Sequence, residues 1–278
     1  MPFARHAYAK INWGLLVGKR MENGYHSLDM LMQSISLCDD LFCEPAPSDI
    51  SISAQGIQVP VDCSNLIWKA AERMRRVCGT DKGAAFHLVK RIPTGAGLGG
   101  GSADCAAALK LLRDMWKPDL PDEVLSDIGA ELGADVPYCL YEKPARVKGF
   151  GEMIEPSDLP SGLHIVILKR SEGIPTGKIF QLYDKNIYNK YVKTLDIAEK
   201  SLSNCNWDEF GRNVCNDLFE PACSLIPGIR ADIQALDDLG SLFTAMSGSG
   251  SAVFGVFGDE ETCRKAAAET GGIAAVTL

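Results

Sequence analysis

The chain has 278 residues, of which 46% are hydrophobic and 23% are charged, and this composition excludes disordered, coiled-coil and collagen-like classes. The length suits one large domain or two of ordinary size. Acidic residues (36) outnumber basic ones (28), the formal charge is −8 and there is no basic tail, so nucleic acid is not an expected partner. An anionic ligand would have to be held by a few local basic residues and by backbone N–H groups at a helix start.

No apolar run reaches the ~18 residues that a membrane span needs, and the first residues lack the apolar core of a secretion signal. We therefore expect no membrane partner and a cytoplasmic location. The ten cysteines are scattered singly, and no two have C-x-x-C spacing. This pattern predicts reduced, buried thiols in a cytosolic chain rather than disulfides or a structural zinc site.

The first half of the chain opens with an extended apolar segment and continues with a mixture of strands and helices. Ser64 or Asn65 is a natural N-cap for a helix that Gly79 ends. The apolar patterns predict strands at 7–17, 49–53, 85–92 and 136–141, and helices at 65–77, 103–116 and 122–132.

Prolines and glycines form one long stretch of helix and strand breakers in mid-chain, between residues 144 and 162, and this predicts a domain boundary near residue 155. Beyond it the patterns predict strands at 163–169, 243–246 and 252–257, and helices at 178–183, 188–202, 207–216 and 228–236. Strands and helices mixed without strict alternation predict an α+β fold of two domains, 1–155 and 156–278.

A glycine-rich loop, Pro93-Thr94-Gly95-Ala96-Gly97-Leu98-Gly99-Gly100-Gly101-Ser102, separates the strand at 85–92 from the helix that follows. In this setting N–H groups converge on an anion and the helix start adds partial positive charge. The glycine spacing also fits the dinucleotide fingerprint, but no βαβ frame surrounds it, and no Walker-type loop is present. The loop therefore predicts a phosphate site of another kind, with a surface hinge as the alternative.

Continued through Ala103-Asp104, this loop resembles the central motif of the GHMP kinases, the family of galactokinase, homoserine kinase and mevalonate kinase. Residues 246–254 resemble the third motif of the family, and residues 9–12 with 24–26 resemble the first motif of one subfamily. The resemblance implies a ribosomal-protein-S5-like N-terminal domain that binds ATP and a ferredoxin-like C-terminal domain that closes over the substrate.

For that subfamily the implied reaction is ATP-dependent phosphorylation of the 2-hydroxyl of 4-diphosphocytidyl-2-C-methyl-D-erythritol, on the non-mevalonate route to isoprenoid precursors. The implied partners are ATP, this CDP-linked sugar alcohol and magnesium, in a monomer or homodimer. Some relatives place a magnesium-binding serine directly after Gly-Leu-Gly, whereas here Ser102 comes later, so the protein ligand of the metal is unassigned. A GHMP kinase for another alcohol and a catalytically silent sensor remain as alternatives.

The resemblance also assigns roles to residues, each of which has an ordinary structural explanation beside it. Asp135 is the expected catalytic base, and Lys10 is its expected partner. On sequence alone, an Asp that caps a turn and a Lys that extends its ammonium into solvent from an edge strand explain the two residues as well. The expected substrate contacts are an aromatic sandwich of the cytosine ring by Tyr25 and Phe180, with His26 and Asn12 at the polar edge of the base. Thr176 is expected, from its position, to contact the substrate as well. The expected ATP contacts are Asn65, Leu66, Pro93, Thr94, Gly95, Ala96, Gly97, Leu98, Gly99, Gly100, Gly101, Ser102 and Ala103. Helix capping accounts for Asn65 equally well.

Overall fold

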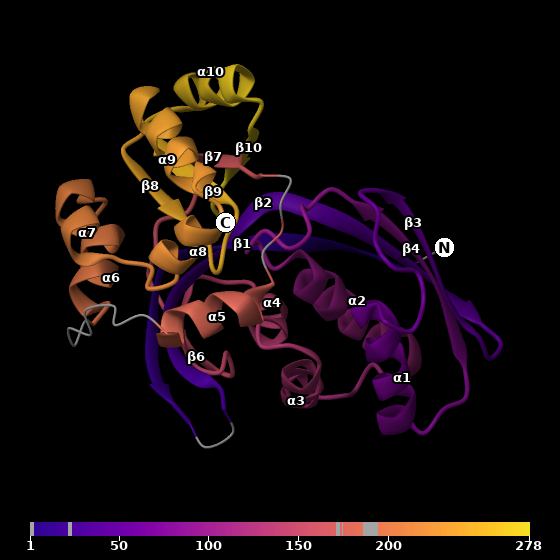
Figure 1. Ribbon diagram of the computed structural model, residues 1–278. Helices are drawn as coiled ribbons and strands as arrows, with labels where there is room; N and C mark the ends of the chain where they lie inside the picture. Colours follow the sequence, from indigo (N-terminus) through magenta and orange to yellow (C-terminus); the bar gives the residue numbers. More distant parts are fainter. Residues whose placement is uncertain (1–2, 22–23, 171–172, 174, 186–193) are drawn as a thin grey trace. The chain divides into compact units, whose positions relative to one another are not determined.

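The computed structural model describes residues 3–21, 24–170, 173, 175–185 and 194–278 (Figure 1). The strands are β1 (Phe3–Arg20), β2 (His26–Ala46), β3 (Ile50–Gly56), β4 (Gly83–Lys90), β5 (Ala145–Gly149), β6 (Met153–Pro156), β7 (His164–Leu168), β8 (Phe243–Met246), β9 (Val253–Phe257) and β10 (Ile273–Val276). The helices are α1 (Leu66–Cys78), α2 (Gly100–Trp116), α3 (Asp122–Leu132), α4 (Val136–Tyr141), α5 (Thr176–Lys185), α6 (Asp196–Ser203), α7 (Trp207–Asn213), α8 (Phe219–Leu225), α9 (Gly228–Asp238) and α10 (Glu260–Thr270).

Two compact units share this chain, and neither is a single continuous segment. Unit 1 comprises Met1–Ala9, Leu37–Thr94 and Gly99–Glu142; unit 2 comprises Lys10–Ser36, Gly95–Leu98 and Lys143–Leu278. The long strands β1 and β2 therefore each contribute to both units. The breaker-rich stretch near residue 155 contains the hairpin β5–β6, which pairs with β2. The boundary expected at residue 155 stays a prediction.

In unit 1, strands β3, β4 and the C-terminal part of β2 form one portion of a sheet. β3 runs parallel to β4, and β4 runs antiparallel to β2. Helix α1 packs against α2 and β3, as Figure 1 shows. The helix predicted at 65–77 is found one residue later at each end, because Asn65 rather than Ser64 is the N-cap and accepts a hydrogen bond from the N–H of Ile67. Its predicted stop is confirmed, since Gly79 ends the helix with a φ of +61°.

The strand predicted at 136–141 is wrong, because these residues form the helix α4. Pro137 lies in the first turn of this helix, where its missing N–H removes no hydrogen bond and its fixed φ favours the helical conformation. A short apolar run does not by itself distinguish a buried strand from a buried helix. The proline was therefore the better signal.

Unit 2 contains a four-stranded antiparallel sheet with the order β10-β7-β9-β8. Counted from β7, this is the order 4-1-3-2 of a ferredoxin-like β-α-β-β-α-β unit, and helices α9 and α10 pack against it. The expected ferredoxin-like C-terminal fold is confirmed. Part of the helix predicted at 188–202 lies outside the described residues, and the described part begins a helix only at Asp196.

The cysteines agree in part with the expectation drawn from their spacing. All ten are free thiols, but Cys63 and Cys205 are exposed rather than buried. Among the residues that the structure describes, no helix has both the length and the apolar character needed to cross a bilayer.

Candidate active site

The glycine-rich loop has a backbone that only glycine adopts easily at alternate positions. Gly95, Gly97 and Gly99 have φ angles of +64°, +80° and +70°, in the left-handed region. At Gly97 space is a second restriction, because a Cβ there would lie 2.1 Å from the carbonyl oxygen of Ser247. The loop is therefore a fixed structure fitted against another segment rather than a free hinge.

Three successive carbonyl oxygens of this loop accept hydrogen bonds from distant segments of unit 2. The oxygen of Ala96 accepts from the N–H of Ala252 at 3.0 Å, and that of Gly97 accepts from the hydroxyl of Ser247 at 2.9 Å. The oxygen of Leu98 accepts from the N–H of Lys10 at 3.0 Å. Because these three oxygens already accept hydrogen bonds, the negative ends of their peptide groups are satisfied within the protein. This arrangement suits a loop whose N–H groups bind an anion.

Lys10 and Asn12 lie beside this loop as a buried polar pair. Lys10 is 3% exposed, and its Nζ donates to Oδ1 of Asn12 at 2.6 Å. The backbone N–H of Asn12 donates to the Ser247 hydroxyl at 3.2 Å. A Cβ on Gly248 would lie 3.2 Å from Asn12 Oδ1 and 3.4 Å from Lys10 Nζ, so the glycine lets its segment approach the pair closely. A buried ammonium held against two glycine-rich segments is well placed to meet a phosphate.

The segment 246–252 is itself fixed by two side chains. The amide of Asn216 donates to the carbonyl oxygens of Met246 at 3.0 Å and Gly248 at 2.8 Å. The hydroxyl of Thr176, at the start of α5, lies 3.1 Å from that of Ser249. The structure thus brings the predicted substrate residue Thr176 to the same segment that contacts Lys10 and Asn12.

The remainder of the glycine loop belongs to unit 1 and forms the start of α2. The N-cap residue Gly99 has no side chain with which to cap the helix, and the first N–H groups of a helix lack intrahelical acceptors. A Cβ on Gly101 would lie 3.9 Å from the side chain of Leu66, so the two predicted ATP contacts are neighbours. On Gly100 a Cβ would be only 2.8 Å from Ile92. This uncapped, glycine-lined helix start fits a polyphosphate.

Both polar atoms of the Asn65 side chain form hydrogen bonds within the protein. Its Oδ1 caps α1, and its Nδ2 donates to the carbonyl oxygen of Pro60 at 2.6 Å. The capping explanation is thus confirmed, and the predicted contact of Asn65 with ATP remains a prediction.

A buried ionic cluster that the sequence analysis did not identify lies under the first turn of α2. Lys90 Nζ is 2.6 Å from Oδ2 of Asp39 and 2.5 Å from Oδ2 of Asp104, and all three side chains are buried. The other oxygen of Asp39 accepts from the backbone N–H groups of Arg91 at 2.5 Å and Ile92 at 2.8 Å. The cluster joins β2, the end of β4 and the first turns of α2.

The two carboxylates of this cluster are not equivalent. Oδ1 of Asp104 is buried without a hydrogen-bond partner among the described residues. Desolvation raises the pKa of Asp104 to about 7, although the nearby Lys90 ammonium acts in the opposite direction. No clear signal in the sequence marked this cluster, because Lys90 is the last residue of its strand and is followed by Arg91, as is common for a lysine in solvent.

Asp135 lies at the N-terminus of α4 and is half buried. The turn before it runs beside the first turn of α2, because a Cβ on Gly133 would lie 3.9 Å from the hydroxyl of Ser102. Within unit 1 the predicted base therefore lies near the predicted phosphate-binding helix start. The expected pairing of Asp135 with Lys10 joins residues of different units and stays a prediction.

The aromatic residues predicted to hold a base are found with different partners. Phe180 stacks on His26, with ring centres 5.7 Å apart and planes 16° apart. Tyr25 is 70% exposed, and its ring meets Phe150 edge to face at 6.2 Å. The sandwich of a cytosine ring between Tyr25 and Phe180 stays a prediction, and Phe150 is an additional aromatic residue beside it.

His26 is fixed on both sides of its ring. Nδ1 lies 3.0 Å from the carbonyl oxygen of Gly18, and Nε2 forms an ion pair at 2.8 Å with Asp184 of α5. Asp184 follows Phe180 by one helical turn, which is the spacing that places both side chains on the same face. This ion pair connects α5 to the start of β2 and was not expected from the sequence.

The family models match both parts of the chain. The model described as the GHMP kinases N terminal domain matches residues 65–143, and the model described as GHMP kinases C terminal matches residues 198–271. The chain belongs to the GHMP kinase family, and it is a kinase that uses ATP.

Curated relatives point to one branch of this family. The 4-diphosphocytidyl-2-C-methyl-D-erythritol kinase of Chlorobium phaeobacteroides is 38% identical over 265 residues, covering 94% of this chain and 91% of the relative. The kinase of the same name from Chloroherpeton thalassium is 39% identical over 264 residues, covering 92% of this chain and 90% of the relative.

Solved structures agree with this placement. A crystal structure of 4-(cytidine 5'-diphospho)-2C-methyl-D-erythritol kinase superposes with a TM-score of 0.83 at 31% identity, covering 99% of both chains. A homoserine kinase from Cytophaga hutchinsonii has a TM-score of 0.73 at 20% identity, covering 97% of this chain and 94% of that one, and it shows the shared fold.

Proposed function

We propose that this chain transfers the γ-phosphoryl group of ATP to the 2-hydroxyl of 4-diphosphocytidyl-2-C-methyl-D-erythritol, a step of the non-mevalonate route to isoprenoid precursors. The observation that carries the proposal is the similarity to kinases of this name over more than nine tenths of the chain. The two glycine-rich segments around Lys10 supply the kind of anion site that the reaction requires.

The triphosphate of ATP is held by residues 93–103. The uncapped N-terminus of α2 and the loop N–H groups face its negative charge, while Leu66 and the cap residue Asn65 lie at the nucleoside end. Magnesium neutralises phosphate charge when it is bound. Among the described residues, no cluster of three or more ligand side chains lies at this loop, so phosphate oxygens and water supply most of the ligands of the ion.

Asp135 accepts the proton of the substrate hydroxyl as the new O–P bond forms and the bond from the γ-phosphorus to ADP breaks. Lys10 stabilises the negative charge that develops on the transferred group, and Asn12 orients its ammonium through the 2.6 Å hydrogen bond. Ser247 and Gly248 keep this pair against the glycine loop. Positioning and charge stabilisation of this kind are the main contributions of a protein to phosphoryl transfer.

The cytidine end of the substrate lies against the aromatic residues of unit 2. Tyr25 and Phe180 stack on the base, a contact worth about 1–3 kcal/mol per base. His26 meets the polar edge of the base, and Thr176 contacts the substrate. The ring of Tyr25 is 70% exposed, with Phe150 beside it. We place the enzyme in the cytoplasm, where its ten thiols stay reduced, and as a monomer or homodimer.

The test is a coupled ADP-release assay with magnesium-ATP and 4-diphosphocytidyl-2-C-methyl-D-erythritol, with cytidine diphosphate as decoy. We expect turnover of the full substrate alone and a loss of about 100-fold or more in kcat for Asp135→Asn. Asp127→Asn, which alters an exposed Asp on α3, is the matched control and should keep its activity. Absence of turnover in folded, ATP-binding protein would refute the substrate and favour another alcohol or a silent sensor.

A further inference from the structure

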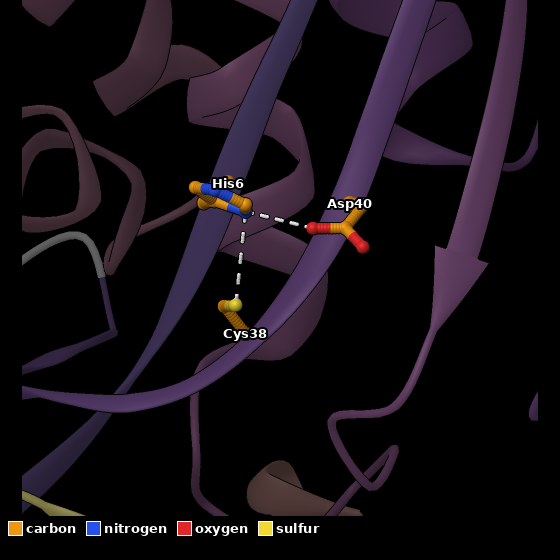
Figure 2. Close-up of side chains that lie close together, drawn as sticks. All are labelled: His6, Cys38 and Asp40. Atoms are coloured by element: carbon orange, nitrogen blue, oxygen red, sulfur yellow. Dashed lines mark hydrogen bonds and ion pairs between the residues drawn. The ribbon is translucent and has the colours of Figure 1, made fainter.

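Three side chains of different chemistry converge on the outward face of the sheet in unit 1. His6 projects from β1, and Cys38 and Asp40 project from β2 (Figure 2). Cys38 and Asp40 are two residues apart on one strand, so they point to the same face, while Asp39 between them points into the core. The three are exposed or half buried and so can be reached from solvent.

Their ligand atoms are already close to the separations found around a tetrahedral ion. Nδ1 of His6 is 2.7 Å from Oδ1 of Asp40 and 3.9 Å from Sγ of Cys38, and all three atoms lie within 4.8 Å of one another. With Zn–N, Zn–O and Zn–S bonds of about 2.0–2.3 Å, neighbouring tetrahedral ligands are roughly 3.3–3.7 Å apart. The exposed imidazole of His6 needs only a small movement to reach this arrangement.

We propose that His6, Cys38 and Asp40 form a surface binding site for a divalent transition metal of the zinc type, with water as the fourth ligand. Imidazole, thiolate and carboxylate are the three protein ligands that zinc prefers, and three protein ligands plus water is a recurrent zinc geometry. Among the described residues, no other group of His, Cys, Asp and Glu brings three ligand atoms together in this way.

Arg91 orients the carboxylate of this site. Its guanidinium forms an ion pair at 2.6 Å with Oδ2 of Asp40, which leaves Oδ1 directed at His6. Neighbours that fix the orientation of a ligand commonly strengthen metal sites. The guanidinium charge opposes a cation, but the thiolate and carboxylate together offset the charge of a divalent ion, and the chain as a whole carries −8.

Binding of the metal displaces protons from the protein ligands to solvent. The thiol proton of Cys38 leaves to solvent as the S–metal bond forms. Because the thiol must lose this proton to bind, the affinity for metal should increase as the pH rises. His6 coordinates through Nδ1, so the proton between Nδ1 and the Asp40 carboxylate also leaves to solvent, and the neutral imidazole carries its one proton on Nε2. No electron is transferred.

The test is a Co²⁺ titration of the full, reduced and metal-free chain, followed by displacement with Zn²⁺. We expect a thiolate-to-cobalt charge-transfer band that saturates at one equivalent and disappears when zinc is added. Cys38→Ser should abolish the band, and His6→Ala should weaken cobalt binding by about tenfold or more. Cys205→Ser, which removes another exposed thiol, is the matched control and should leave the band unchanged.

Two outcomes would overturn the proposal. A wild-type chain with no charge-transfer band at stoichiometric cobalt would show that His6, Asp40 and Arg91 form an ion-pair network and nothing more. A band that persists in Cys38→Ser would place the metal on another thiol. The site is at the surface, so circular dichroism should show all variants folded, and the result is independent of kinase activity.

Discussion

Replacing Asp104 with Asn should make the chain more stable at about pH 8, even though it removes one partner of a buried lysine. The pKa of Asp104 lies at about 7 in the folded chain against an ordinary value of 3.8, because desolvation outweighs the attraction of Lys90. Between these two values the folded state binds more protons than the unfolded state, so the stability contributed by this group falls as the pH rises from about 4 to about 7. At ~1.4 kcal/mol per pH unit, the full loss is about 4 kcal/mol.

The Asp104→Asn side chain would have nearly the same shape as the carboxylate but would stay neutral, so this loss should disappear. Lys90 would keep its ion pair with Asp39 at 2.6 Å and would then face one carboxylate rather than two. We therefore expect Asp104→Asn to gain stability over the wild type by about 2–4 kcal/mol at about pH 8 and to show no gain near about pH 4.

Urea unfolding at about pH 4.5, about pH 6 and about pH 8 measures the free energy of unfolding of both proteins across this window. Asp127→Asn, on the exposed surface of α3, controls for the general effect of removing a negative charge. A loss of about 3 kcal/mol or more in Asp104→Asn at about pH 8 would refute the reasoning, because it would mean that the attraction between Lys90 and the Asp104 carboxylate outweighs the cost of burying that charge.

Two further predictions concern the glycine loop and the cytidine end of the site. Gly97→Ala should reduce kcat/KM for ATP by about tenfold or more, because its φ of +80° and the carbonyl of Ser247 at 2.1 Å both exclude a Cβ. Gly211→Ala, in α7 with open space around it, is the matched control, and steady-state kinetics showing equal effects of the two would contradict this explanation. Asp184→Asn should raise KM for the cytidine substrate by about threefold to tenfold with kcat and KM for ATP unchanged, because it weakens the ion pair that fixes His26. Equal changes in the two KM values would instead indicate a general structural role.

Local signals in the sequence predicted a large part of this fold. Asn65 and Gly79 marked the ends of α1 because caps depend on a few neighbouring atoms. The glycines of residues 95–101 indicated a special backbone conformation, and Gly95, Gly97 and Gly99 do have the positive φ that is costly for other residues. The α+β class followed from the irregular order of strands and helices.

Features that depend on distant residues were not predicted. The ion pair of His26 with Asp184 and the cluster of Lys90 with its two carboxylates join segments that no short pattern relates. The hairpin β5–β6 was missed because its glycines and prolines are equally typical of a linker. The pairing of strands, and not the composition, distinguishes a hairpin from a linker here.

The hydrogen bonds that hold the carbonyl oxygens of residues 96–98 have a consequence for how the kinase is assembled. The donors are residues 10, 247 and 252, so the loop is closed by parts of the chain made at the beginning and near the end of synthesis. Contacts of such high sequence separation form late, because the intervening chain must first be ordered. During synthesis, the residues of the loop are therefore complete long before residues 247 and 252 are available to hold the loop in its conformation. A fragment truncated near residue 155 would lack two of the three hydrogen-bond donors.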